Sequence, residues 1–143
     1  MKNNIETFEK ISTNLRYELI KLIHKTKTSH LGSSLSCIDI LVGIYFSKNG
    51  IGSNANNKKN LKNTFILSKG HAAPALYVVL ERKKYISKKM LNTYSKPKSY
   101  LEEHPNININ GVLVSSGSLG HGLSYAAGMS LADKITKKNN KHI

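Results

Sequence analysis

The sequence contains one cysteine, no tryptophan and only two arginines among its 22 basic residues. Because Cys37 is alone, no intrachain disulfide can form, as is typical of proteins in a reducing compartment. No apolar run approaches the ~20 residues that a membrane-spanning helix requires. The N-terminal segment lacks the apolar core of a secretory signal and contains Glu6 and Glu9. We therefore expect a cytoplasmic protein that does not cross a membrane.

The net charge of +14 comes almost entirely from lysine. Clustered cations can bind nucleic acid by releasing counterions from its phosphates. Here the lysines are spread among asparagines without interleaved aromatic residues, and only Arg16 and Arg82 have the forked group that reads base edges. We therefore expect a solvated lysine-rich surface and no nucleic-acid partner, with a nucleic-acid-binding protein as the alternative. A basic surface would also attract phosphorylated substrates.

Helical periodicity dominates the predicted secondary structure. Apolar side chains at steps of three and four predict four helices, at residues 5–26, 37–47, 72–83 and about 119–137. Ser87 is expected to cap a fifth, shorter helix.

Three details of these helices can be compared with a structure. In the first helix, the spacing places on one face Ile5, Phe8, Ile11, Leu15, Leu19, Leu22 and Ile23. Ser36 followed by Asp39 resembles a capping box for the second helix. The small residues at 126–128 would let the last helix approach a neighbour closely.

Two short apolar runs, at residues 64–68 and 112–114, predict strands. Strands that alternate with helices indicate an α/β fold with mainly parallel pairing. Two strands are too few for a parallel sheet, which must be covered on both faces. We therefore expect one partial domain over residues 1–143, helix-rich with few parallel strands, and polar or irregular loops at 48–63 and 96–111.

Four motifs place histidine or glycine in loops, where functional groups are commonly displayed. They are Ser29-His30-Leu31-Gly32, Ser68-Lys69-Gly70-His71, Glu102-Glu103-His104-Pro105 and Ser116-Gly117-Ser118-Leu119-Gly120-His121-Gly122. Taken singly, a loop histidine is more often structural than catalytic, and a glycine-rich turn is most often only a turn. The functional alternative for the glycine turn is an anion cradle, made of backbone N–H groups and the start of the next helix. His24 and His142 lie outside such motifs and are interpreted as structural or solvent-facing.

In this order and spacing, the four motifs are similar to the N-terminal part of transketolases, especially those divided between two subunits. The resemblance runs from about residue 12 to residue 135. Deoxyxylulose-phosphate synthases share the His-Leu-Gly/Ala-Ser loop but differ at the later motifs, and are the second choice. The resemblance implies the first half of a thiamine-diphosphate-binding domain, in an enzyme of the pentose phosphate pathway that transfers a two-carbon ketol unit between sugar phosphates.

The resemblance also implies roles for individual residues. His30 is similar to an imidazole near the reacting carbons, His71 to one beside the cofactor diphosphate and the reaction centre, and His104 to one that lines the substrate channel. Several imidazoles suit the proton transfers on sugar oxygens near neutral pH. The stretch whose backbone would contact the cofactor is Gly117, Ser118 and Leu119. No role is assigned to His121, which stands where many relatives have glutamine.

The sequence departs from the family pattern at the metal site. Transketolases bind the diphosphate through a metal ion such as Mg²⁺, held by a Gly-Asp-Gly segment and a later asparagine. Asp39 and Asp133 are the only aspartates here, and neither is flanked by glycines, so we expect no metal ligand in this chain. The pyrimidine-binding half of the cofactor site is expected on another domain or subunit. The chain is therefore interpreted as a truncated product or one piece of a homo- or hetero-oligomer, inactive alone; a non-catalytic remnant or partner-binding fragment is the alternative.

Overall fold

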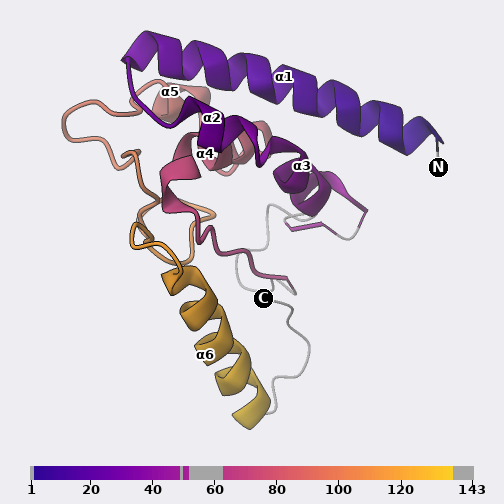
Figure 1. The fold of residues 1–143 in the computed structure, drawn as a ribbon, viewed down its shortest axis with the longest axis vertical. Helices are drawn as coiled ribbons and strands as arrows, with labels where there is room; N and C mark the ends of the chain where they lie inside the picture. The colour runs from indigo at the N-terminus through magenta and orange to yellow at the C-terminus, as the bar shows by residue number, and fades with distance from the viewer. Residues whose placement is uncertain (1, 49, 52–62, 137–143) are drawn as a thin grey trace.

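The computed structural model describes residues 2–48, 50–51 and 63–136, which form a helical body and one projecting helix (Figure 1). None of the helices in this part is long and apolar enough to cross a membrane. In chain order the helices are α1 (Lys2–Thr26), α2 (Leu31–Leu35), α3 (Ile38–Phe46), the 3₁₀ turn η1 (Gly70–Ala72), α4 (Ala73–Arg82), α5 (Lys88–Leu91) and α6 (His121–Ile135).

α4 is the central helix of the body. Every residue from Ala73 to Leu80 is buried, because the segment is apolar on all sides. Helices α1, α2, α3 and α5 pack around it. Pro74 stands in its first turn, where a missing N–H breaks no helical hydrogen bond. The predicted helix over 72–83 is confirmed. It directly follows η1, and its Tyr77 hydroxyl bonds to the backbone carbonyls of Glu102 and His104.

α1 lies across the top of the body and packs on α3 and α4 (Figure 1). Its predicted apolar face is confirmed, since Phe8 and Ile11 are partly buried, while the side chains buried on this face are Leu15, Leu19, Leu22 and Ile23. The side chain of Ile5 lies outside the described residues. Arg16 of α1 donates to Asp39 of α3, and this hydrogen bond, with one from Ser12, holds the pKa of Asp39 below its usual range. The buried apolar face and this exposed ion pair both join the two helices.

The predicted loop after α1 contains the short helix α2, which the spacing of apolar residues does not predict. His30 precedes α2 with φ at 70°, in the left-handed region that few non-glycine residues adopt. The predicted capping box is wrong, because Ser36 Oγ donates to the carbonyl of Ser33 and α3 begins after Cys37 without a side-chain cap. The cap predicted at Ser87 is confirmed, since its hydroxyl accepts from the Met90 N–H at the start of α5. A five-residue helix is too short for periodicity to detect.

The two predicted strands are not formed within the described ranges. Residues 64–68 and 112–114 follow an extended or turning path, and an isolated bridge at Asn63 is the nearest feature of strand type. A strand exists only when a neighbour pairs with its N–H and C=O groups, and no described segment does so for either run. The described part of the chain is therefore helical, without the sheet of an α/β fold. The predicted loop at 48–63 lies mostly outside the described residues.

α6 extends away from the body and meets it at its first turn (Figure 1). Gly122 is buried there, and a Cβ atom added to it would lie 2.5 Å from the Cβ and 2.6 Å from the Cα of Ser68. Glycine therefore permits the helix to rest on the 64–68 segment. The close approach predicted for residues 126–128 is not observed, since a Cβ at Gly128 would have no atom within 4 Å.

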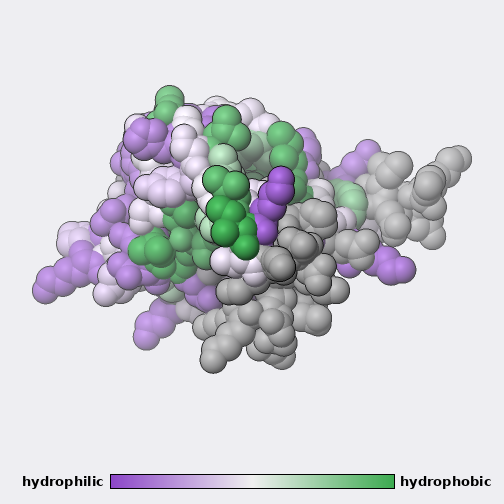
Figure 2. Space-filling view, turned by 90° about the horizontal axis from the view of Figure 1, so that it is seen from below, coloured by the Kyte–Doolittle hydropathy of each residue, from purple (hydrophilic) through white to green (hydrophobic). Residues whose placement is uncertain are grey.

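The surface of α6 and of the turn before it is largely apolar. Figure 2 looks from below, where α6 points toward the viewer, and apolar groups are gathered in the middle of that face. The large exposed side chains of this segment are Leu119, Leu123, Tyr125, Leu131 and Ile135. An apolar surface of this kind is typical of a face that another polypeptide covers.

Replacing Gly122 with alanine should destabilise the chain by about 1–3 kcal/mol, because the added methyl group overlaps Ser68 and must push the helix or the 64–68 segment away. The matched control is Gly128→Ala in the same helix, where the methyl group meets nothing and helix propensity improves by up to about 1 kcal/mol. Urea denaturation of both variants measures the difference. Equal stabilities for the two variants would contradict the contact between α6 and Ser68.

Candidate functional site

Three imidazoles from three distant segments lie in one cluster. His30 precedes α2, His71 lies in η1, and His104 lies in the irregular segment after α5. The ring centroid of His30 is 5.4 Å from that of His71 and 6.3 Å from that of His104. His30 and His71 are partly exposed and His104 is exposed, so the cluster is open to solvent. The structure thus brings together the three histidines that the sequence singled out.

The glycine turn before α6 borders the same cluster. A Cβ added to Gly117 would lie 3.6 Å from the ring of His104. On the other side of the glycine turn, a Cβ added to Gly70 would lie 3.0 Å from the carbonyl carbon of Ser116, so the η1 turn packs directly against the backbone of Ser116. Ser116 is also held by hydrogen bonds, because its hydroxyl donates to the carbonyl of Leu67 at 2.7 Å and its N–H donates to that of Pro105 at 3.3 Å. The turn is therefore fixed to the segments that carry His71 and His104.

The N-terminus of α6 opens beside this turn. No side chain caps it, and Gly120, at φ 88°, adopts a conformation that glycine alone enters without strain. The residues of the turn that the sequence assigned to a cofactor, Gly117, Ser118 and Leu119, are exposed. The N-terminus lacks a side-chain cap, and the positive end of a fifteen-residue helix favours a negative group at this position. His121 contributes a ring nitrogen 3.3 Å from Ser118 Oγ.

Lys69 anchors the loop that carries His71. Its ammonium group donates to the carbonyl of Ser33 at 2.8 Å and to the hydroxyl of Ser36 at 2.9 Å, which ties this loop to α2. Burial, followed by the positive charges of His30, Lys69 and His104, holds the pKa of His71 below its ordinary value of 6.5. His71 is therefore neutral at physiological pH, and its ring can both donate and accept a proton.

The pKa of His71 should rise in the variant His30→Asn, because one of the neighbouring positive charges disappears and the ring becomes more exposed. An NMR titration of the imidazole carbon protons checks this, with His24→Asn as a control outside the cluster. An unchanged His71 titration in His30→Asn would contradict the clustering of the two rings.

In the parent chain the low pKa of His71 makes the free energy of unfolding depend on pH. The folded chain binds this proton less tightly than the unfolded chain, so this group raises the free energy of unfolding as pH increases from the folded pKa to 6.5.

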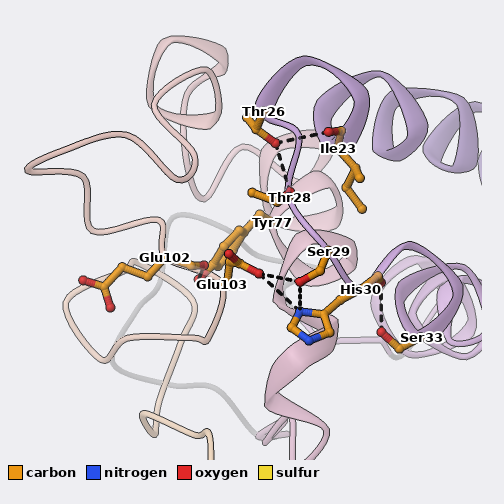
Figure 3. A network of polar contacts seen from close by, with 9 residues as sticks. All are labelled: Ile23, Thr26, Thr28, Ser29, His30, Ser33, Tyr77, Glu102 and Glu103. Carbon is orange, nitrogen blue, oxygen red and sulfur yellow. Dashed lines mark hydrogen bonds and ion pairs between the residues drawn. The ribbon is translucent and has the colours of Figure 1, made fainter.

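Sequence reasoning did not assign roles to three polar residues at the edge of this cluster. Ser29 and Glu103 contact His30, and the hydroxyl of Tyr77 holds the backbone around Glu103 (Figure 3). Ser29 and Glu103 lie within the quoted motifs next to His30 and His104. Their position was the only available signal, since nothing in a sequence shows which way a loop carboxylate points.

The residues described do not provide a metal site. No group of three or more histidine, cysteine, aspartate or glutamate side chains in this part of the chain could hold an ion. Asp39 is engaged with Arg16 on the helical body. Mg²⁺ requires several oxygen ligands, so the donor set for this ion is not present among the described residues.

Clustered imidazoles beside a helix N-terminus without a side-chain cap are typical of proteins that bind an anionic group and move protons near it. The family comparison gives this class a more specific identity. Residues 8–142 match the family described as transketolase, thiamine diphosphate binding domain. The chain belongs to this family.

Three relatives are named as transketolases or transketolase subunits. The chain is 38% identical over 137 residues to one of the subunits of the apulose-4-phosphate transketolase of Phocaeicola vulgatus, and the match covers 96% of this chain and 48% of that protein. It is 35% identical to 6-deoxy-6-sulfo-D-fructose transketolase subunit SqwG of a Clostridium species, over 82% of this chain and 43% of that protein. Human transketolase is 29% identical over 96% of this chain and 22% of its own length. The chain thus spans about half the length of the subunit relatives.

Proposed function

We propose that this chain is the N-terminal, diphosphate-binding portion of a thiamine-diphosphate-dependent transketolase that transfers a two-carbon ketol unit between sugar phosphates. The observation that carries the proposal is the meeting of His30, His71 and His104 beside the Gly117 turn. Two of the relatives above are themselves subunits of transketolases, which favours a divided enzyme here too.

The backbone of Gly117, Ser118 and Leu119 would hold the diphosphate of the cofactor. The turn fits such a group because it is exposed and no side chain caps the helix behind it. Among the described residues, the atoms within 4 Å of a Cβ added at Gly117 belong to the His104 ring, the nearest at 3.6 Å. His71 would lie beside the same group and contribute hydrogen bonds. When bound, thiamine diphosphate supplies the electron sink that allows a carbon–carbon bond next to a carbonyl to break.

The imidazoles would handle the protons of the sugar hydroxyl groups. A neutral ring near pH 7 can accept a proton from one oxygen and return it to another, which suits a reaction that moves protons at each stage. The low pKa of His71 keeps this ring neutral. His30 and His104 would contact the substrate, with His104 on the side of the channel next to the glycine turn.

Mg²⁺ is proposed as the metal of the complete enzyme, with its ligands outside this chain, because the described residues do not supply the oxygen set. The partners we propose are the remainder of the diphosphate-binding domain and a pyrimidine-binding domain or subunit, in a homo- or hetero-oligomer. The apolar side chains exposed along α6 support a covering polypeptide.

The finer features of the complete enzyme are part of the same proposal. In a completed domain, residues 64–68 would become a strand of a parallel sheet once a neighbour pairs with them, giving the α/β fold. We place the enzyme in the cytoplasm and in pentose phosphate metabolism. A truncated, non-catalytic remnant that binds a partner subunit is the second candidate, and a fragment of a deoxyxylulose-phosphate-synthase-like enzyme is the third.

A tagged copy of the chain, purified from its own cells, tests the function. The expected result is co-purification of polypeptide carrying a Gly-Asp-Gly segment and a pyrimidine-binding domain, and ketol transfer from a ketose phosphate to an aldose phosphate on addition of thiamine diphosphate and Mg²⁺. In calorimetry, the chain alone should not bind the cofactor tightly. A companion without transfer activity would favour the remnant, and tight binding by the isolated chain would contradict the division of the site.

A further inference from the structure

Ser29, His30 and Glu103 form a polar network that joins the turn before α2 to the segment after α5 (Figure 3). Ser29 Oγ lies 2.9 Å from Glu103 Oε2 and 3.2 Å from His30 Nδ1. The same carboxylate oxygen is 3.4 Å from His30 Nδ1. One nitrogen of the imidazole therefore faces a serine hydroxyl and a carboxylate, while the other faces away from both (Figure 3).

The chemistry of the three groups sets the direction of these hydrogen bonds. An ionised carboxylate can only accept, so the single hydroxyl proton of Ser29 is donated to Glu103. The serine oxygen then offers only lone pairs to His30, and Nδ1 must be the donor. The nearby negative charge favours a proton on Nδ1 as well. In the neutral ring the proton is thus on Nδ1, and Nε2 carries the lone pair of a base.

Both ends of the network are held by contacts of their own. The buried hydroxyl of Tyr77 lies 2.9 Å from the carbonyl of Glu102 and 3.0 Å from that of His104, the residues on either side of Glu103. Burial raises the pKa of Tyr77, so this hydroxyl keeps its proton and remains a donor. On the other side, the carbonyl of His30 accepts from the hydroxyl of Ser33 at 2.8 Å, which fixes its left-handed backbone.

The two neighbouring glutamates differ in orientation. The side chain of Glu103 turns toward Ser29 and His30, whereas that of Glu102 points away from the network (Figure 3). Glu103 is partly buried and Glu102 is exposed. They have the same charge and stand one residue apart, so Glu102 is a matched control for any effect of Glu103.

We propose that Glu103 is a positioning residue that acts through Ser29 to hold His30 in the tautomer with Nε2 unprotonated. In this form His30 presents a base on the side of its ring turned away from the carboxylate, ready to accept a proton from a substrate hydroxyl. The catalytic part of this inference rests on the proposed function; the tautomer itself does not.

The tautomer can be measured directly on the chain by ¹⁵N NMR of the histidine side chains at about pH 8, where an ordinary imidazole is neutral. The parent chain should show a protonated-type Nδ1 and an unprotonated-type Nε2 for His30. In Glu103→Ala the serine proton is free to turn toward Nδ1, so the two resonances should move toward each other or exchange positions. Glu102→Ala should leave the parent pattern unchanged. Glu103→Gln, which keeps the shape and removes the charge, should fall between the two.

The outcomes separate this inference from the proposed function. An Nε2-protonated ring in the parent chain, or the parent pattern in Glu103→Ala, would overturn the positioning role whatever the enzyme catalyses. In the assembled enzyme, Glu103→Ala should lower kcat by about 10- to 100-fold, less than the loss expected on removing the imidazole itself. A changed tautomer with unchanged kcat would confirm the positioning of His30 and remove His30 from the catalytic residues.

Discussion

Replacing His30 with alanine should lower the kcat/KM of the assembled enzyme by about 10²–10⁴-fold, which is the usual contribution of a positioned acid–base group. The reason is that this ring lies 5.4 Å from the ring of His71 and 6.3 Å from that of His104, between centroids. Its Nδ1 contacts Ser29 and Glu103, which leaves Nε2 turned toward the side that a substrate would occupy. Steady-state kinetics of ketol transfer with the companion subunit present measure the effect.

The control for this variant is His24→Ala. His24 is an exposed residue of α1 whose ring contacts Lys27 outside the cluster, so its removal should change kcat/KM little. Binding of thiamine diphosphate by the two variant enzymes shows whether the site is still assembled. Normal turnover by His30→Ala with normal cofactor binding would remove His30 from the catalytic residues.

Replacing Leu19 with alanine should lower the free energy of unfolding by about 2–5 kcal/mol. Leu19 is fully buried on the inner face of α1, and the truncated side chain would leave a cavity that a close-packed interior fills only in part. The neighbouring Ile20 points outward and is 45% exposed, so Ile20→Ala should cost much less. Urea denaturation followed by circular dichroism compares the two. Similar losses in both variants would contradict the orientation of α1.

The helices could be predicted because the pattern that indicates a helix lies within the helix's own residues. The buried face of α1 is predicted by apolar residues at spacings of three and four, and α4 by a short, largely apolar segment. Ser87 forms its cap within one turn of the chain. The short helix α2 and the uncapped start of α3 depart from local rules. At α2, the left-handed His30 is held by contacts with Ser33 and with a segment over seventy residues away, so no local pattern reports it.

The prediction of the two strands was wrong for a different reason. Residues 64–68 have the composition of a strand, but composition does not supply the neighbour that a strand must pair with. In the described chain this segment serves instead as a surface on which Gly122 rests and to which Ser116 is bonded through Leu67. Gly122 belongs to one of the four motifs, but its close contact with Ser68 joins segments far apart in the chain and cannot be read from spacing.

For the site, motif order predicted which residues come together, and the geometry places His30, His71 and His104 in one cluster with Gly117 at its edge. Their catalytic and cofactor-binding roles stay predictions. Glu103 could not be separated from Glu102 in the sequence, because the difference between them is the direction of a side chain in an irregular loop. The backbone of this loop is held by the Tyr77 hydroxyl of α4, which is distant in the sequence.

The glycine turn, the η1 turn and the two other histidine loops come from widely separated parts of the chain, and this has a consequence for how the protein reaches its native state. Contacts between distant segments close large loops and therefore form late, after the local helices. The imidazole cluster should thus appear only in the final, rate-limiting step of refolding, whereas far-ultraviolet circular dichroism should recover earlier. A histidine resonance from the cluster would then serve as a reporter of complete folding, distinguishing native molecules from compact species whose helices have formed without their tertiary order.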